Sequence, residues 1–396
     1  MSATAPAPEQ ETLTINMGPQ HPSTHGVLRV QLELQGETVL KATPIIGYLH
    51  TGIEKTFEVK TYVKGLPMTD RMDYLSANNI NLAYVLSIEA LLGLEIPKRA
   101  QYIRVLLAEL GRINSHLVWL ATHAMDIGAM TVFLYAFRER EKILDLFEMV
   151  AGARMMPSFI RPGGVRQELP PGFEEAVRTF IDEMPARIDE YEALLTKNQI
   201  WRMRTVGVGM LTAAQALDLS VTGPCLRASG VARDLRKDKP YCSYEEFEFA
   251  VPTRTAGDTF ARYEVRMQEM RESLLIVRQT LDRMPGPPLN ADAPKVVPPP
   301  RDRLYKSMEA MIHHFMIWTD GFPVPPGEAY VPTEGPRGEA GFYIVSNGTQ
   351  KPQRVKMRAP SFIHLQALDP MVRGRLIADV VTVIGTLDFV IGEVDR

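Results

Sequence analysis

PKRAQYIRVLLAELGRINSHLVWL, residues 97–120, carries a regular apolar pattern. Its large apolar side chains recur at i, i+3, i+4 and i+7, which is the spacing of one face of an α-helix. They are Ile103, Leu106, Leu107, Leu110, Ile113, Leu117 and Leu120. Pro97 stands where the first turn of a helix tolerates proline. The segment therefore predicts a long amphipathic helix whose apolar face packs into a helical core.

The same periodicity predicts helices on both sides of this segment. The expected helices are residues 76–92, 131–151, 173–198, 257–284 and 303–319. Gly93 and Gly152 directly follow two of them, and glycine often ends a helix. Pro185 predicts a kink or a break in its helix, because proline has no N–H to donate to the preceding turn.

Strand-like patterns lie at both ends of the chain. Between Thr12 and Lys41 apolar and polar residues alternate, as in residues 28–34 (LRVQLEL), and Gly36-Glu37 has the form of a hairpin turn. Residues 341–346 and 353–358 are also strand-like. The predicted class is α+β, a mainly helical core with small β regions at the N- and C-terminal ends.

These patterns divide the chain into consecutive parts. They are a flexible tail (1–11), an N-terminal β region (12–60), a helical core (61–284), a Pro-rich connection (285–302) and a C-terminal helix and β region (303–396). The connection contains two proline clusters and few apolar residues. This composition favours an extended path across the surface.

Composition argues against several classes of protein. The chain has 396 residues, 45% of them hydrophobic, and its 44 basic and 47 acidic residues give a formal charge of -3. No basic run would follow a phosphate backbone, so nucleic acid is not an expected partner. No uncharged apolar stretch reaches the roughly 18 residues that cross a bilayer. Cys225 and Cys242 form no CxxC pair, which argues against a disulfide framework or a cluster site and fits a reducing cytoplasm.

Two histidines lie four positions apart in a turn-rich motif, Gly18 to Gly26. They are His21 and His25, and Pro22 argues against one regular helix carrying both. A zinc site needs at least three protein ligands, and His50 is a nearby third candidate, but no Cys or HExxH pattern supports a metal. The alternative is that the histidines cap and cross-link a tight loop. Their density in this loop favours a functional site that holds no metal.

Two loops are candidates for ligand contact. Asp70 to Tyr74 (DRMDY) directly precedes a predicted helix, and its structural interpretation is capping by Asp73 or Ser76. Arg161 to Val165 (RPGGV) contains glycines that permit close backbone approach. Neither this loop nor Gly207-Val208-Gly209 has a phosphate-binding pattern, so nucleotide binding is not predicted.

Three further polar residues lie along the long helix and just beyond it. His116 and His123 are seven positions apart and share a face, and Asp126 follows one turn later. A single histidine on such a face usually belongs to the core or the surface. The positions alone leave both interpretations open.

A series of motifs occurs in order along the chain. They are GPQHPSTHGVLR (18–29), IGYLHTGIEKTFE (46–58), DRMDYL (70–75), FREREKILDLFE (137–148), IRPGGV (160–165), LRASG (226–230), RAPSF (358–362) and GEVDR (392–396). In these motifs the chain resembles the D subunit of bacterial respiratory NADH-quinone oxidoreductase (complex I), a family related to the nickel-iron hydrogenase large subunit. The resemblance implies one hydrogenase-like family domain over residues 12–396.

The resemblance also implies a site. Hydrogenases hold their metal with two CxxC-type pairs that this sequence lacks, so no metal is expected in this chain. By the resemblance, the vacated space receives a quinone headgroup. His25 and Tyr74 match the two headgroup donors of the family, and Asp126 matches the acidic partner of that histidine. Quinone reduction takes two electrons and two protons, which a tyrosine hydroxyl and an imidazole can supply. His25, Tyr74 and Asp126 are therefore the expected catalytic residues.

Two positions depart from the family pattern near the terminal 4Fe-4S cluster, which the resemblance assigns to a partner subunit. Many members have an arginine after the YLH motif and a histidine two residues after the GAR motif, where this chain has Thr51 and Met156. Less positive charge makes electron uptake by the cluster harder, so we expect a lower cluster potential. A low-potential quinone such as menaquinone would suit it.

Partners and location follow from the same resemblance. The expected partners are the cluster-bearing B subunit, the C subunit, the quinone-channel H subunit of the membrane and other subunits of the peripheral arm. The chain would lie on the cytoplasmic side of the cell membrane, in indirect contact with it, and would be inactive outside its proton-pumping enzyme. Two alternatives stay open: a subunit of a membrane-bound hydrogenase-like complex, and a non-catalytic scaffold with a degenerate site.

Overall fold

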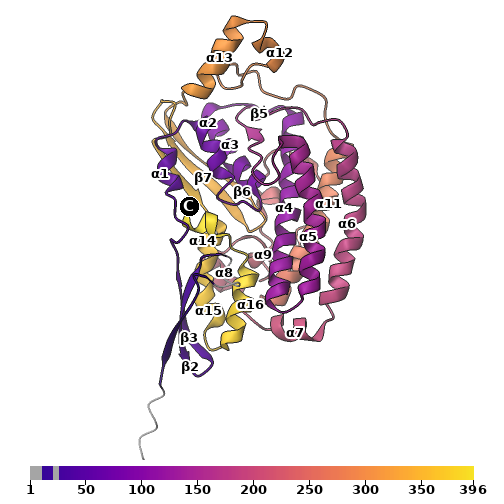
Figure 1. Ribbon diagram of the computed structural model, residues 1–396, viewed down its shortest axis with the longest axis vertical. Helices are drawn as coiled ribbons and strands as arrows, with labels where there is room; N and C mark the ends of the chain where they lie inside the picture. The colour runs from indigo at the N-terminus through magenta and orange to yellow at the C-terminus, as the bar shows by residue number, and fades with distance from the viewer. Residues whose placement is uncertain (1–10, 21–25) are drawn as a thin grey trace, which may run out of the picture.

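The computed structural model describes residues 11–20 and 26–396. A layer of long helices stands beside smaller helices and sheets (Figure 1). The long helices are α4 (Lys98–Asp126), α5 (Met130–Ala151), α6 (Phe173–Leu195) and α11 (Thr259–Asp282), and they pack side by side. The predicted α+β class with a mainly helical core is confirmed.

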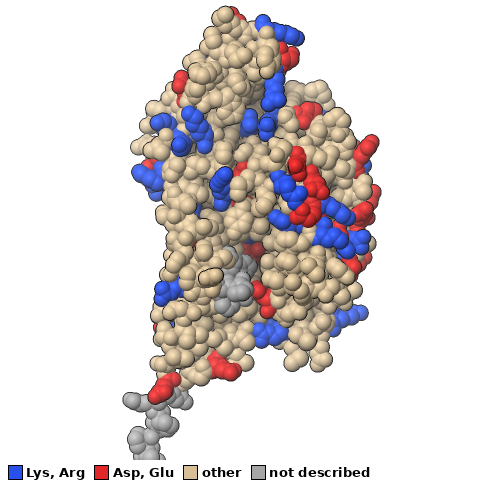
Figure 2. Space-filling model, in the orientation of Figure 1, with Lys and Arg blue, Asp and Glu red and all other residues tan. Residues whose placement is uncertain are grey.

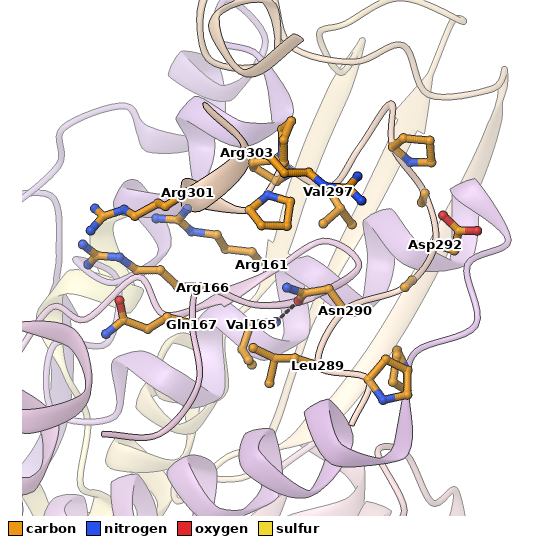
Figure 3. A pocket seen from close by; sticks show the side chains of 18 of the residues that line it. Arg161, Val165, Arg166, Gln167, Leu289, Asn290, Asp292, Val297, Arg301 and Arg303 are labelled. Atoms are coloured by element: carbon orange, nitrogen blue, oxygen red, sulfur yellow. Dashed lines mark hydrogen bonds between the residues drawn. The ribbon is translucent and has the colours of Figure 1, made fainter. Parts of the chain in front are cut away.

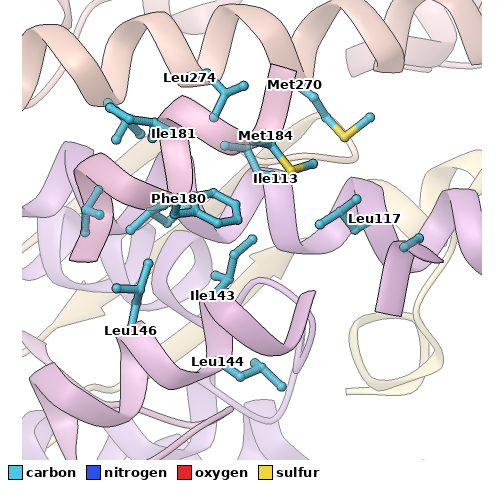
Figure 4. Close-up of a cluster of buried hydrophobic side chains, with 14 of the residues drawn as sticks. Ile113, Leu117, Ile143, Leu144, Leu146, Phe180, Ile181, Met184, Met270 and Leu274 are labelled. Carbon is cyan, nitrogen blue, oxygen red and sulfur yellow. The ribbon is translucent and has the colours of Figure 1, made fainter. Parts of the chain in front are cut away.

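The bundle is held by apolar stripes that the long helices turn toward one another (Figure 4). Ile113 and Leu117 of α4 meet Ile143 of α5 and Phe180 of α6, and none of the four is more than 3% exposed. Burying one such side chain stabilises the fold by about 1.5–3 kcal/mol. The apolar residues that recur at i, i+3 and i+4 in the sequence thus form the face through which the helices pack.

Helix α6 continues through Pro185, so the expected break is wrong, and the alternative, a kink, stays a prediction. Proline inside a helix costs about 3 kcal/mol because it removes a backbone hydrogen bond and crowds the preceding turn. The neighbouring side chains of Ile181, Met184 and Ile188 are at most 1% exposed and belong to the bundle core. Their burial outweighs the cost of the proline.

The N-terminal sheet contains β1 (Leu13–Met17), β2 (Arg29–Gln35) and β3 (Thr38–Ile45) in antiparallel order β1-β2-β3. The predicted alternation and the turn at residues 36–37 are confirmed. Val30 and Leu32 are fully buried in one cluster with residues of α16 (Ile377–Leu387).

The start and the end of the described chain also meet. The carboxylate of Asp395 accepts hydrogen bonds from the backbone N–H groups of Gly47, at 2.8 Å, and Leu49, at 2.6 Å. These contacts join residues nearly the whole chain apart. The segment after β3 is therefore positioned by the last helix, α17 (Ile391–Asp395).

The C-terminal sheet packs on α3 (Ala77–Leu92) and has the antiparallel order β6-β7-β8. Strands β7 (Glu339–Ser346) and β8 (Arg354–Arg358) agree with the sequence pattern, whereas β6 (Gly327–Glu334) was not predicted. Pro332 lies within β6 and argues against a central strand. The structure accommodates it because β6 is an edge strand.

The predicted helix at residues 303–319 is two helices. They are α12 (Arg301–Leu304) and α13 (Met308–Thr319), and the hydroxyl of Ser307 accepts a hydrogen bond from the Ala310 N–H at 3.3 Å to cap α13. A serine at the N-cap starts a new helix instead of continuing the old one. The residues between Asp282 and Arg301 form no helix or strand, as their prolines predict.

The remaining helices and strands are short. They are α1 (Ile53–Phe57), α2 (Tyr62–Thr69), β4 (Ile160–Arg161), β5 (Gly164–Val165), α7 (Gln199–Thr205), α8 (Ala213–Asp218), α9 (Gly223–Arg227), α10 (Leu235–Asp238), α14 (Pro360–His364) and α15 (Leu368–Val372), with 3₁₀ turns at Tyr244–Glu246 and Leu365–Ala367. Within the described ranges, no helix combines the length and the apolar character needed to cross a membrane.

A buried network of charged groups ties α4 to α11 and to the segments around α10. Glu109 accepts hydrogen bonds from the hydroxyls of Tyr244 (2.6 Å) and Ser273 (2.7 Å). It also pairs with Arg112 and Arg236, each at 3.2 Å. Burial would raise the pKa of Glu109, but the two guanidinium groups hold this pKa below its usual value. The carboxylate is thus charged and fully paired inside the core.

Candidate functional site

Tyr74 lies on the loop between α2 and α3, and carboxylates of the same loop hold it in place. Asp70 Oδ2 accepts hydrogen bonds from the backbone N–H of Ser158, at 3.0 Å, and from its hydroxyl. Asp73 Oδ1 accepts from the N–H groups of Leu75 and Ser76, each at 3.2 Å. The DRMDY segment is therefore a structured turn.

The expected capping of α3 is only partly realised. Ser76 occupies the N-cap position, but its side chain makes no capping hydrogen bond. Its hydroxyl accepts instead from the side-chain amide of Asn79 at 2.5 Å. Asp73 stabilises the turn before α3 through Oδ1, whereas its Oδ2 accepts a hydrogen bond from Arg337. Neither side chain acts as an ordinary helix cap.

The Tyr74 side chain is half-buried, and its hydroxyl has no hydrogen-bond partner among the residues that the structure describes. Burial raises the pKa of this hydroxyl, and the positive charge of Arg337 partly opposes the shift. The phenol therefore keeps its proton at neutral pH. It can donate one hydrogen bond to a ligand without breaking a bond to any residue that the structure describes.

Behind Tyr74 lies a buried charged cluster, which we call the Arg337 cluster. Its members are Asp73, Arg337, Asp388 and Glu393, all at most 4% exposed. Arg337 donates to Asp73 Oδ2 at 2.6 Å and to the backbone carbonyl of Asp388 at 2.7 Å. Burial, with the charge of Asp73 adding to it, raises the pKa of Glu393 to about 7. The cluster fixes the position of Asp73 and therefore of the loop that carries Tyr74.

Sequence analysis missed the Arg337 cluster. Asp73 and Arg337 are 264 positions apart, so no local spacing connects them. One signal was available: Asp388 and Glu393 lie within apolar runs, and a charged residue in such a run is buried only with partners. That signal indicates a partnered charge but does not identify the partner.

Asp126 is the last residue of α4, and it is less buried than the two histidines of that helix, His116 and His123. His116 is fully buried and forms a 3.0 Å contact with Glu269; burial lowers its pKa to about 4. His123 is also fully buried and stacks on Trp119, with a centroid distance of 5.5 Å. Both histidines belong to the core, whereas Asp126 is only partly buried.

The histidine motif lies largely outside the described residues. His21 and His25 fall in the gap between residues 20 and 26, so the pairing of His25 with Asp126 stays a prediction. The nearby His50 is described, and its Nδ1 lies 2.6 Å from the carbonyl of Asp395.

Thr51 and Met156 are both at the surface, and Met156 is 37% exposed. The guanidinium of Arg71 approaches the Met156 sulfur at 3.7 Å. Tyr48 and Leu49, near Thr51, are 47% and 41% exposed. These positions can contact a partner, and Arg71 supplies a positive charge next to Met156.

The glycines of the Arg161–Val165 loop do permit close approach, but to another segment of the same chain. A Cβ on Gly164 would lie 2.0 Å from Asn290 Oδ1, and one on Gly163 would lie 2.5 Å from Val297. The N–H of Val165 donates to Asn290 Oδ1 at 2.9 Å. The loop therefore anchors the Pro-rich connection.

No metal centre is evident in the described part of the chain, where no group of three or more His, Cys, Asp and Glu side chains has suitable geometry. Cys225 and Cys242 are buried free thiols. Burial raises the pKa of Cys242 to about 11, so it stays protonated at neutral pH.

Comparison with known proteins shows that the chain belongs to a class of enzyme subunits. The family model described as "Respiratory-chain NADH dehydrogenase, 49 Kd subunit" matches residues 126–396. The chain is 57% identical over 386 residues to the NADH-quinone oxidoreductase D subunit of Trichlorobacter lovleyi, covering 98% of this chain and 99% of the relative. It is 59% identical over 390 residues to the D 2 subunit of the same enzyme in Koribacter versatilis, covering 98% and 97%. The chain therefore belongs to the D subunit family of NADH-quinone oxidoreductase, and it is one of the subunits of that enzyme complex.

Proposed function

We propose that this chain forms part of the site at which the enzyme reduces quinone, and that Tyr74 donates a hydrogen bond and then a proton to one carbonyl of the headgroup. The half-buried hydroxyl without a partner in the described structure carries this proposal. A buried phenol that already had a partner would have to lose it to bind a ligand. Within the described part of the chain, Tyr74 has no such bond to lose.

The surroundings of Tyr74 suit a proton donor. Its raised pKa keeps the hydroxyl protonated until the headgroup gains electrons and becomes a stronger base. The 2.6 Å pair between Asp73 and Arg337 restrains the adjacent backbone, so the hydroxyl has a defined position. When the phenol gives up its proton, the positive charge of Arg337 favours the phenolate.

The second donor in this proposal is His25, with Asp126 as its acidic partner. A carboxylate beside an imidazole favours the charged ring and fixes its orientation. When His25 gives up its proton, Asp126 loses its counter-charge. In this proposal, that loss triggers proton pumping elsewhere in the enzyme.

We further propose the setting of the site. The chain binds the B subunit of the enzyme, which carries the terminal 4Fe-4S cluster, together with the C subunit and the quinone-channel H subunit. It lies on the cytoplasmic side of the cell membrane without entering it, and menaquinone is its substrate. A hydrogenase-like role is disfavoured, because the two cysteines of the sequence cannot supply two thiolate pairs.

Replacing Tyr74 by phenylalanine tests the proposal. In the assembled enzyme we expect kcat for NADH:quinone reduction to fall by about 10²–10⁴-fold, because the variant keeps the ring but cannot donate a proton. Electron transfer from NADH to a water-soluble acceptor that bypasses the quinone site should be unchanged. Tyr135→Phe is the matched control, since Tyr135 is also partly buried and its hydroxyl makes no hydrogen bond within the described chain. Normal kcat and KM in Tyr74→Phe would leave the scaffold alternative standing.

The two departures near the cluster give a second prediction. We expect the terminal cluster to have a low midpoint potential that does not change with pH, because Thr51 and Met156 hold no titrating charge. In the Met156→His variant, the potential should rise at pH values where the imidazole is protonated, by tens of millivolts. Redox titration of the cluster at several pH values measures this; a strongly pH-dependent potential in the unmodified enzyme contradicts it.

A further inference from the structure

A groove of about 1960 Å³ lies between α13 and the segments around residues 161–167 and 286–303. Three arginines reach it from separate parts of the chain: Arg161 and Arg166 from the β4–β5 region, and Arg301 from α12. Figure 3 shows the ends of their side chains gathered on one side of the groove. Among the described residues, α4 is the one bundle helix that lines the groove, through its first residue, Lys98.

The charges of this groove are unbalanced. Six Lys or Arg side chains line it against three acidic ones, and only Lys98 among the six forms an ion pair within the described chain. Arg161 is the most enclosed: its guanidinium lies 4.9 Å from the Trp318 ring centroid, and burial lowers its pKa to about 10. Enclosed cations without carboxylates are costly unless a binding partner supplies negative charge.

Helix α13 exposes its apolar stripe at the surface of the chain. Met308, Met311, Ile312, Phe315 and Met316 recur at i, i+3, i+4, i+7 and i+8, and they are between 44% and 77% exposed. An amphipathic helix normally buries such a stripe. Here the opposite side of the helix faces the groove through Ala310, His313 and His314.

The helix also stands away from the body of the molecule. Figure 1 shows α12 and α13 projecting beyond the ends of the bundle helices, and Figure 2 shows Lys and Arg side chains on the surface beneath them. The buried Nδ1 of His314, on the groove side, has no hydrogen-bond partner among the described residues. The exposed stripe and this unsatisfied nitrogen show that part of the α13 surface lacks contacts, although Ile317, on the side opposite the stripe, is only 2% exposed and belongs to the core.

We propose that α13 and the groove together bind one other subunit of the enzyme, which receives the apolar stripe in an apolar cleft and places carboxylates among Arg161, Arg166 and Arg301. A helix laid in an apolar groove is a common mode of recognition, and methionines adapt well to such a partner. The excess of unpaired cations fixes the sign of charge on the partner.

The positions of the apolar stripe and the basic groove favour a protein over a membrane as the binding partner. The stripe and the basic groove lie on opposite sides of α13, and a planar bilayer can contact only one of these sides at a time. A protein surface with a cleft and an acidic rim can enclose both. The surface is also distinct from Tyr74, because neither Tyr74 nor any member of the Arg337 cluster lines the groove.

Photo-crosslinking in the intact enzyme tests the proposal. A photoreactive phenylalanine analogue replaces Phe315, and in the control variant it replaces Met203, which is 72% exposed on α7 and outside this surface. We expect position 315 to give one major adduct, to an apolar segment of a single other subunit with acidic residues close to it. Mass spectrometry of the adduct identifies the segment.

A charge test accompanies the crosslink. The double variant Arg301→Glu and Arg303→Glu should reduce the yield of the adduct at least tenfold, whereas Lys239→Glu, exposed and outside the groove, should not. If the double variant does not assemble, the crosslinking variant that keeps both arginines is used instead. Its yield of adduct should fall as the salt concentration rises, because salt screens the charges. Adducts only to lipid, only to a second copy of this chain, or to a segment without acidic neighbours overturn the proposal. So does the absence of any adduct at position 315.

Discussion

Replacing Glu109 by glutamine should lower the free energy of unfolding by about 3–5 kcal/mol. The glutamine keeps the size of the side chain but removes the charge that compensates Arg112 and Arg236, both at most 1% exposed. Two guanidinium groups would then face each other in the core with less neutralising charge. Arg236 would keep its 2.6 Å pair with Asp234, whereas Arg112 would keep only backbone carbonyl acceptors.

Urea denaturation of the full chain, followed by the fluorescence of the buried Trp119 and Trp201, measures this loss. Glu245→Gln is the control: Glu245 is a surface residue 3.9 Å from Lys98, and its replacement should change stability by less than about 0.5 kcal/mol. Equal denaturation midpoints for the two variants would show that the Glu109 network contributes nothing to stability.

The same carboxylate gives the stability a pH dependence with a defined sign. The folded protein holds the pKa of Glu109 below the value of about 4.5 for an unperturbed glutamate. The stabilisation is therefore fully present above pH 4.5 and is lost as pH falls toward the lower folded pKa. In Glu109→Gln this part of the acid sensitivity should disappear, so the stability difference between variant and unmodified chain should narrow at low pH.

Replacing Gly392 by alanine should reduce quinone reduction by on the order of a hundredfold, although residue 392 does not face the substrate in our proposal. A Cβ at this position would lie 2.6 Å from the carbonyl oxygen of Met72 and 2.8 Å from that of Arg71. These are backbone atoms of the loop that carries Tyr74, so the loop must move. A displacement of about 1 Å at a reacting group can cost a hundredfold in rate.

The change should also destabilise the chain by about 1–3 kcal/mol, the usual cost of overpacking. Lys239→Ala is the control, because Lys239 is exposed and lies outside both the DRMDY loop and the groove. Activity should be compared in assembled enzyme with equal content of this subunit, using kcat and KM for quinone and the rate with a water-soluble acceptor. Full quinone turnover in Gly392→Ala would mean that the position of the DRMDY loop does not control the chemistry.

Much of the fold could be predicted from periodicity, because a helix or strand with one buried face has apolar residues at regular intervals in the sequence. The bundle helices and strands β2, β3, β7 and β8 all have this pattern. Strand β6 does not, because an edge strand accepts Pro332, and the division of α12 from α13 depends on one serine. Helix α6 shows the opposite error, since the local rule for Pro185 is outweighed by packing that the rule ignores.

The site was less predictable than the fold. From spacing alone, Asp73 had the form of a helix cap; only the resemblance to a known family singled out Tyr74. The contact of Asp73 with Arg337 could not be predicted from local sequence. Glu109 and Arg112 were not singled out in the sequence, and the structure places both in the core with Arg236 as a third partner.

The bonds from Asp395 to Gly47 and Leu49 have a consequence for biogenesis. They connect positions up to 348 residues apart, and the apolar side of strand β2 packs in one cluster with residues of α15 and α16, which are also made late. A ribosome adds about 5–20 residues per second, so the N-terminal hairpin waits roughly 20–70 s for its cover. During translation, Val30 and Leu32 therefore stay exposed, and such transiently exposed apolar surface favours aggregation until the late helices emerge.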